Sequence, residues 1–437
     1  MLMFVLHLVF QLLLSSLFLS FHYTTGPMLY NGVCHLFCQY NPYAAIWGNI
    51  SWGHSVSYNL VDWIHLEPAL NPTEKYDING CWSGSATLLA GESKPVILYT
   101  GSDFLGQQVQ NLAMPKDLSA PLLREWAKSS HNPLMLPVEG IDPDFFRDPT
   151  MAWQGPDGSW RVLVGSQVGG HGCALLYVLK ASFNDHDYYV QGSYNAETDE
   201  FGVVGVDFMD DVVQLRYDYG VFYASKMSYD DARKRRMLWG WVTEADDVER
   251  GWSGLMSSPR SVLLDEDQKQ LIQWPIEEVE ELRGEKVALE NKEIESGSVL
   301  EIGGITGSQK SHSVFQIWRG VELIDGGLLD PQMLCRQKNA SVEGVFGPFG
   351  LLVLASDNLT EQTALFFRAF RQNEKHVVLM CSDQIRSSLQ TRVKEAIFGS
   401  FLDVDLDQEI SLRTLVCCLI ITLYNIGFET IDSFAVF

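Results

Sequence analysis

From Gly26 to about Trp274, apolar and polar positions alternate in short runs that are separated by Gly, Pro, Asn and Asp. The runs include KPVILYTG, WRVLVGS, YGVFYASK and RMLWGWV, and none of this region keeps the 3.6-residue period of an amphipathic helix. The pattern therefore predicts an all-β region of many short strands joined by polar turns. Tryptophans recur along it at uneven spacing, which favours β units arranged around an axis, as in a propeller.

The pattern changes after residue 275. Over residues 276–298, Glu and Lys are interleaved with Val and Leu, which predicts a short helix and a linker. Alternating runs then return at short spacing, a pattern typical of a β-sandwich. We therefore predict a propeller over residues 26–275 and a sandwich over residues 299–437. The apolar stretch near residue 420 is too short to span a bilayer.

The first residues of the chain predict passage through the secretory pathway. Residues 1–21 form an apolar run long enough for the core of a signal peptide or for a membrane anchor, and we favour the signal peptide. An uncleaved anchor is the alternative, and it is the one case in which we expect contact with a membrane. Three glycosylation sequons, which begin at Asn49, Asn339 and Asn358, fit a secreted protein.

The eight cysteines do not repeat at the spacing of zinc ligands, so we predict no metal site. Most of them fit small core residues. Cys335 and Cys381 each border a strand-like run in the last third of the chain, and disulfides persist in an oxidising compartment. We therefore predict a disulfide between these two residues.

Charge and composition narrow the class of ligand. Lys and Arg number 31 against 55 Asp and Glu, which gives a net charge of −24 and argues against nucleic acid as a partner. The 12 Trp and 16 Tyr suit neutral sugars, although aromatic packing in β cores explains them equally well. The chain has no G-x-S-x-G, no Gly-rich phosphate loop and no Cys-x-x-Cys, so we predict no cofactor.

The segment with the strongest features of a site is IDPDFFRDP, in which Arg147 and Asp148 precede a proline. A charge pair at the end of a strand can keep its carboxylate ionised and directed at a ligand. The alternative is a surface ion pair in a turn. Three isolated histidines have no partners at ligand spacing, so we expect structural roles for His54, His171 and His186.

Several long motifs resemble the plant acid invertases and fructan exohydrolases of glycoside hydrolase family 32. They include GPMLYNGVCHLFCQYNPYAAIWGNISWGHSVSYNLVDWIHLEPAL, DINGCWSGSATLL, FFRDPT, RRMLWGWVTEADDVERGWSG and FGPFGLLVLASDNLTEQTALFFR. The resemblance is colinear over about residues 26–415. It implies a five-bladed β-propeller with the site in a central funnel, followed by a β-sandwich. The implied activity is hydrolysis of terminal β-D-fructofuranosides, with sucrose or a fructan as substrate and without a cofactor.

The resemblance also assigns roles to individual residues. It implies that Asp148, beside Arg147, stabilises the transition state of a retaining mechanism. The positions that it assigns to sugar contact are Gln39, Trp47, Trp82, Ser83 and Asp187. Tryptophan rings fit apolar sugar faces, and Gln or Ser fits hydroxyl groups. The alternative for each Trp is packing in the propeller core.

The chain departs from the family at both other catalytic carboxylates. The nucleophile motif Asn-Asp-Pro-Asn-Gly, which belongs directly before Gly26-Pro27-Met28, is replaced by FHYTT. The Glu-Cys motif of the acid/base is also missing, since CALLY runs directly into VLKASFNDHDYY. We do not expect the missing nucleophile or acid/base to be replaced by Asp142, Asp144 or Glu244. After Leu415 the tail no longer resembles the closing strands of the family's sandwich.

We therefore expect a glycosidase of the β-fructofuranosidase type that is inactive as given, because losing two carboxylates removes covalent catalysis. The alternatives are a non-catalytic sugar-binding or regulatory homologue and a propeller-and-sandwich interaction protein with no role in sugar binding. The expected partners are sucrose or a fructan, with a cell-wall polysaccharide as a further candidate. The sequence favours an extracellular or cell-wall location over the vacuole.

Overall fold

The structure is a computed structural model. It describes residues 20–44, 46–89, 94–155, 158–168, 171–173, 180–183, 186–189, 192–195, 200–203, 215–220, 222–242, 254–264, 271–282, 295, 298–301, 309–315, 322–323, 330–337, 348–353, 355–372, 375–387, 389, 397–402, 410–416, 421–426 and 433–436. Apart from a few short helices, the regular structure of these residues consists of β-strands, which confirms the predicted all-β class. Within the described residues, no helix is long and apolar enough to cross a membrane.

The first two sheets are antiparallel, with their strands in sequence order. The first contains β1 (Ser20–Tyr30), β2 (Val33–Asn41), β3 (Ser51–Ser57) and β4 (Ile64–Leu70). The second contains β5 (Cys81–Leu89), β6 (Lys94–Ser102), β7 (Gln108–Pro115) and β8 (Trp126–Lys128). One apolar cluster, which includes the buried Phe37, Trp52, Tyr99 and Trp126, joins the two sheets. β1 begins at Ser20, so it overlaps the predicted leader by two residues.

The described residues between 153 and 203 form pairs of short strands. Their strands are β9 (Trp153–Gln154), β10 (Trp160–Arg161), β11 (Ser166–Val168), β12 (His171–Cys173), β13 (Lys180–Phe183), β14 (His186–Tyr189), β15 (Gly192–Asn195) and β16 (Glu200–Val203). Among the described residues these strands pair two by two, and they do not join into a four-stranded sheet. A larger sheet follows, made of β17 (Phe222–Asp230), β18 (Arg235–Val242), β19 (Leu255–Met256), β20 (Arg260–Leu264) and β21 (Leu271–Pro275).

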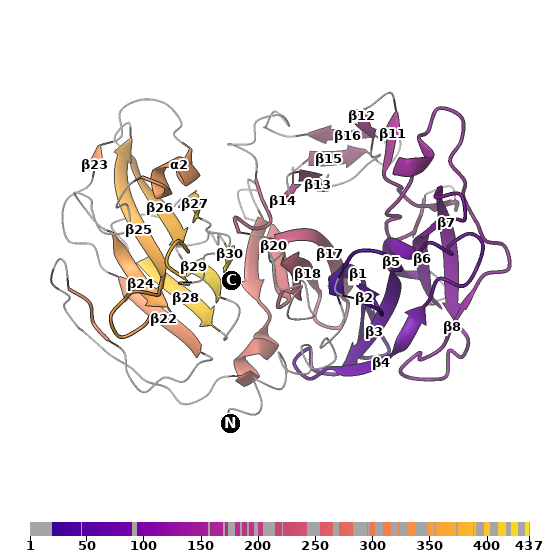
Figure 1. Ribbon diagram of the computed structural model, residues 1–437, viewed down its shortest axis with the longest axis horizontal. Coiled ribbons are helices and arrows are strands. Elements are labelled where there is room, and N and C mark those ends of the chain that lie inside the picture. Colours follow the sequence, from indigo (N-terminus) through magenta and orange to yellow (C-terminus); the bar gives the residue numbers. More distant parts are fainter. Residues whose placement is uncertain are drawn as a thin grey trace.

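These sheets lie in a ring (Figure 1). β1 packs against β5 of the second sheet and against β17 of the last sheet, so the two ends of the ring meet at the first strand. The approach of β1 to β5 requires a residue without a side chain, because a Cβ on Gly26 would lie 2.7 Å from the backbone nitrogen of Ala86. After β21, the 3-10 helix η3 (Glu277–Leu282) packs on β18 through a buried ion pair between Arg235 and Glu278.

The last part of the chain forms two further sheets, at the left of Figure 1. The first contains β22 (Gln309–Phe315), β28 (Ile410–Val416), β29 (Ile421–Ile426) and β30 (Ser433–Val436). The second contains β23 (Glu322–Leu323), β24 (Phe349–Val353), β25 (Thr363–Gln372), β26 (Lys375–Asp383) and β27 (Ile397–Leu402). The tail after Leu415, where we expected the sequence to depart from the family, supplies β29 and β30.

The predicted disulfide between Cys335 and Cys381 is confirmed. It joins the short helix α2 (Pro331–Cys335) to β26, inside a buried apolar cluster. Gly399 lies opposite Cys381 on β27, and a Cβ at Gly399 would collide with the sulfur of Cys335. The glycine therefore leaves the space that the disulfide fills.

Candidate functional site

Gln39 and Ser83 come from different sheets and meet. Both side chains are buried, Gln39 on β2 and Ser83 on β5. The Gln39 amide nitrogen donates to the carbonyl of Cys81 at 3.3 Å, and its amide oxygen accepts from the Ser83 hydroxyl at 3.4 Å. Two residues predicted to bind sugar hydroxyls are thus brought together between the first two sheets.

Trp47 and Trp82 form an aromatic pair beside this contact. Their ring centroids lie 5.2 Å apart at an interplanar angle of 65°. Trp47 is 58% exposed, so it does not pack in the propeller core, whereas Trp82 is half-buried. The carbonyl of Trp82 accepts from the buried indole of Trp52 at 2.9 Å. An edge-to-face pair with one ring in solvent can bind the apolar face of a neutral sugar.

The connection that carries Trp47 is shaped by Asn41 at the end of β2. The Asn41 side chain accepts from the backbone nitrogen of Tyr43 and donates to the carbonyl of Ile46, both at 2.9 Å. Gly48 follows with a φ of +129°, a conformation that residues with a Cβ rarely adopt. These local bonds set the direction in which Trp47 leaves the sheet.

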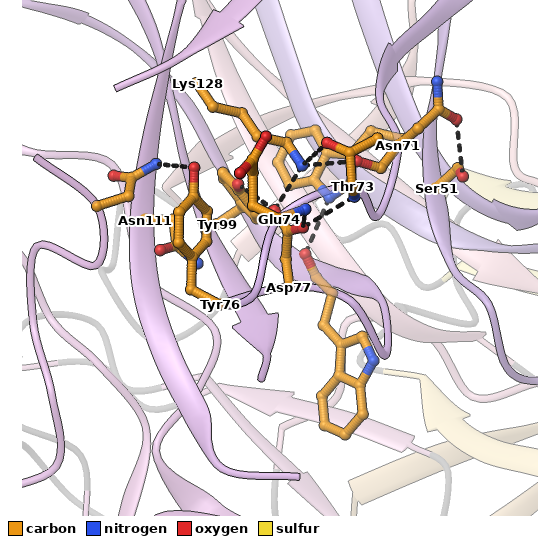
Figure 2. A network of polar contacts seen from close by, with 12 residues as sticks. Ser51, Asn71, Thr73, Glu74, Tyr76, Asp77, Tyr99, Asn111 and Lys128 are labelled. Carbon is orange, nitrogen blue, oxygen red and sulfur yellow. Dashed lines mark hydrogen bonds and ion pairs between the residues drawn. The ribbon is translucent and has the colours of Figure 1, made fainter. Parts of the chain in front are cut away.

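The connection between β4 and β5, which leads into Trp82, is held by an ion pair between the buried Asp77 and the half-buried Lys128 (Figure 2). The ammonium of Lys128 lies 2.6 Å from the carboxylate of Asp77, and it donates to the Asn71 carbonyl and the Thr73 hydroxyl. Asp77 also accepts from the Tyr99 hydroxyl at 2.7 Å and from backbone nitrogens of its own loop. Burial holds the pKa of Tyr99 well above its usual range, and the nearby Cys81 and Asp77 raise it further. The Tyr99 hydroxyl therefore keeps its proton and stays a donor.

Asp148 lies in the segment after the short 3-10 helix η1 (Pro143–Phe145). Its carboxylate is 47% exposed and lies 3.9 Å from the guanidinium of Arg147. Arg147 also stacks over the ring of Phe145 at 5.2 Å and donates to the Asp144 carbonyl at 3.1 Å. The Asp148 carboxylate is therefore open to a ligand, with a cation beside it.

Strand register places Asp148 near the other site residues. Cys81 pairs with Gly101 and Gly84 pairs with Tyr99, with an irregularity between them, so Trp82 and Ser83 lie opposite Thr100. The backbone nitrogen of Asp148 donates to the Thr100 hydroxyl at 2.9 Å. Gln39, Trp47, Trp82, Ser83 and Asp148 therefore occupy neighbouring strands and connections. No group of three metal-ligating side chains occurs among the residues that the structure describes.

Asp187 is placed differently. It is fully buried on β14, and its carboxylate accepts from the backbone nitrogen of Ser225 at 2.6 Å. Its backbone carbonyl accepts from Tyr217. None of these contacts joins Asp187 to the Trp47–Trp82 pair, and its contact with sugar stays a prediction. Asp142 caps η1 and is exposed. Glu244 and Asn339 lie outside the described residues.

A buried histidine pair was not expected from the sequence. His54, predicted to be structural, lies on β3 with a ring nitrogen 3.0 Å from one on His35 of β2, and Phe37 stacks on it at 4.5 Å. Burial lowers the pKa of His35 to about 4. Burial, then His35 and Arg124, lowers that of His54 to about 3. Both rings are neutral near pH 7.

Comparisons with known proteins show which family the chain resembles. The family model "Glycosyl hydrolases family 32 N-terminal domain" matches residues 24–184 and 178–275. The chain is 45% identical to an insoluble beta-fructofuranosidase isoenzyme of Arabidopsis thaliana over 477 aligned positions, which cover 93% of this chain and 80% of the relative. It is also 45% identical to a fructan 6-exohydrolase of Beta vulgaris, with 90% and 78% covered.

The structure superposes on that of a fructan 1-exohydrolase IIa variant from Cichorium intybus, solved with 1-kestose, with a TM-score of 0.90. The two chains are 44% identical, and the match covers 96% of this chain and 89% of the other. This similarity confirms the predicted propeller-and-sandwich architecture. With the family model matching more than half of the chain, it shows that the chain belongs to glycoside hydrolase family 32.

Proposed function

We propose that this protein binds the terminal fructosyl unit of sucrose or a fructan in the site formed by Gln39, Trp47, Trp82, Ser83 and Asp148. The observation that carries the proposal is their placement on neighbouring strands and connections, where Gln39 contacts Ser83, the exposed Trp47 pairs with Trp82, and the Asp148 carboxylate is open. In this arrangement the tryptophans take the apolar sugar face, while the amide, the hydroxyl and the carboxylate take its hydroxyl groups. The Beta vulgaris and Cichorium intybus relatives, both fructan exohydrolases by name, support the substrate class.

We propose further that the chain as given does not hydrolyse these sugars. A retaining glycosidase needs a nucleophile and an acid/base carboxyl about 5 Å apart, and the motifs that carry them are missing from the sequence. Two observations support a missing internal segment. The 477-position alignment is longer than the 437-residue chain, and the family model matches in two pieces that meet at residues 178–184.

Hydrolysis is tested by incubating the purified protein with sucrose and measuring released glucose and fructose. We expect a rate equal to that of a blank. Release that exceeds the blank and is abolished by Asp148→Ala would overturn the proposal, because it would require a pair of carboxylates that the family motifs do not supply.

Binding is expected to be weak, with a Kd in the millimolar range, about −4 kcal/mol. Each polar group of a sugar site that is left without its partner costs about 1 to 3 kcal/mol. The test is a calorimetric titration with 1-kestose on protein shown to be folded. Micromolar affinity that is lost in Trp82→Ala would contradict this estimate and favour the alternative, a non-catalytic sugar-binding or regulatory protein.

We propose an extracellular location, at the cell wall and in reach of its polysaccharides, in preference to the vacuole. The Pisum sativum relative is named a cell wall isozyme, and the Cys335–Cys381 disulfide fits an oxidising compartment. Asn49 and Asn358 are exposed, as acceptors of N-linked glycans must be. Fractionation of tissue that expresses the tagged chain, with and without glycosidase treatment, tests both points. Recovery from the vacuole would contradict the proposal.

A further inference from the structure

The backbone of Asp148 adopts a conformation that needs support. Its φ is +65°, in the left-handed region where residues other than glycine are uncommon. Such a residue keeps this conformation when the surrounding structure holds it, and residues of this kind cluster at functional sites. The hydrogen bond from the Asp148 backbone nitrogen to the Thr100 hydroxyl is one such hold.

Thr100 is itself oriented by Gln110. The two residues are direct partners across β6 and β7, and both are buried. The Thr100 hydroxyl donates to the Gln110 amide oxygen at 3.0 Å, and the Gln110 amide nitrogen donates to the carbonyl of Phe146 at 2.6 Å. The hydroxyl hydrogen points to Gln110, so an oxygen lone pair faces Asp148. Thr100 and Gln110 thus hold the chain on both sides of residue 147.

A second glutamine, Gln108, also binds the segment that carries Asp148. Gln108 lies two residues before Gln110, hence on the same face of β7. Its amide nitrogen donates to the carbonyl of Asp144, and its amide oxygen lies 3.5 Å from the donating guanidinium nitrogen of Arg147. Alternate side chains of one strand therefore bind alternate carbonyls of the segment that carries Asp148.

We propose that Thr100 and Gln110 are positioning residues that aim the Asp148 carboxylate at the bound fructosyl unit. The proposal rests on the proposed function, in which Asp148 contacts the sugar. The side chain of a strained residue is directed by its backbone, and here the backbone is held by a threonine hydroxyl that acts as donor and acceptor at once. A residue of the same shape without a hydroxyl cannot provide that hold.

The test compares Thr100→Val, Thr100→Ser and Gln110→Met with the unmodified protein. Thr87→Val is the matched control, because the buried Thr87 hydroxyl accepts from the backbone nitrogen of Ala152 at 3.1 Å, four residues beyond Asp148. Two quantities are measured on folded protein by NMR: the affinity for 1-kestose by titration, and the hydrogen exchange of the Asp148 backbone amide.

We expect Thr100→Val and Gln110→Met to weaken binding of 1-kestose about tenfold or more and to speed exchange at the Asp148 amide. Thr100→Ser should restore both quantities, and Thr87→Val should leave the affinity and the Asp148 amide unchanged. If Thr100→Val does not fold, Gln110→Met carries the same test.

Two results would overturn the positioning role. One is unchanged affinity in folded Thr100→Val, which would leave the proposed function standing. The other is an equal loss of affinity in Thr87→Val, which would point to general loosening of the sheet. If the unmodified protein does not bind 1-kestose at all, the proposed function fails. In that case hydrogen exchange alone tests whether Thr100 supports the Asp148 backbone. Unchanged exchange at the Asp148 amide in Thr100→Val would show that it does not.

Discussion

Two buried histidines in the first sheet predict that the stability of the protein depends on pH. His35 and His54 are almost fully buried and bonded to each other, and each outer ring nitrogen lacks a hydrogen-bond partner among the described residues. A charged imidazole at either position would lose its hydration, and Arg124 adds repulsion at His54. The pair is therefore stable in its neutral form.

Protonation should therefore destabilise the fold in acid. The unfolded histidines gain a proton near pH 6.5, while the folded ones resist it down to about pH 4 and pH 3. The unfolded state thus binds more protons below pH 6.5, and stability falls as the pH drops. Between pH 7 and pH 4.5, we expect each of these two residues to lower the free energy of unfolding by about 2 to 3 kcal/mol. Urea unfolding at both pH values measures this change.

The matched variants for this measurement are a double substitution, His35→Phe with His54→Phe, and His131→Gln. The double variant removes both titrating rings, so its stability should change less with pH than that of the unmodified protein. His131 is exposed, and its replacement should leave the pH dependence as it was. An unaltered dependence in the double variant would refute the assignment.

At the scale of an element, the connection between β4 and β5 depends on Lys128 for its order. In Lys128→Met the Asp77 carboxylate stays buried and loses its counter-charge. Removing one partner of a buried pair commonly costs about 3 to 5 kcal/mol. We expect a loss of this size in urea unfolding followed by tryptophan fluorescence, and a partial recovery when Asp77→Asn is added.

Lys116 provides the comparison. It pairs with Glu125 at 2.9 Å in the connection between β7 and β8, but both side chains are largely exposed. Exposed pairs contribute roughly 0 to 1 kcal/mol, so Lys116→Met should change little. Equal effects of the two substitutions would show that burial of Asp77 does not set the stability of this connection.

The pairing of β5 with β6 depends on Gly84. A Cβ at this position would collide with the carbonyl oxygen of Leu98 on the neighbouring strand. We expect Gly84→Ala to destabilise the protein by about 3 kcal/mol or more, because backbone on both sides must move. Gly106→Ala meets open space and only an unfavourable φ of +86°, so it should cost about 1 kcal/mol. Thermal unfolding measures the stability of both variants. A larger loss in Gly106→Ala than in Gly84→Ala would contradict the predicted clash.

At the scale of the whole molecule, the disulfide closes a long loop of the sandwich. Cys335 and Cys381 are 46 positions apart, so the bond should contribute roughly 3 to 4 kcal/mol by restricting the unfolded chain. The double substitution Cys335→Ala with Cys381→Ala should lower the denaturant midpoint of the sandwich accordingly. Peptide mapping of the unmodified protein checks the bond itself, and recovery of two free thiols would refute it.

The all-β class and its two parts, the ring of sheets and the sandwich, could be predicted from sequence patterns that are local in the chain. Alternation with a period of two predicted strands, because side chains of a strand point to opposite faces. Motifs such as DINGCWSGSATLL and FFRDPT predicted the family and the residues at Trp82 and Asp148. The bond between Cys335 and Cys381 was predicted from the strand-like run beside each residue and from the expected oxidising compartment. In the structure Cys335 ends the helix α2 and Cys381 lies within β26.

Contacts between distant positions depended on the tertiary structure. The Gln39–Ser83 contact, the His35–His54 pair and the hold of Thr100 on Asp148 each join different strands or connections. Alternation assigns a residue to a face of its strand, but register and the closure of the ring decide which residue lies opposite it. Gln108 and Gln110 are alternate positions in the sequence and had no predicted role, and only the packed segment 144–148 showed what they bind.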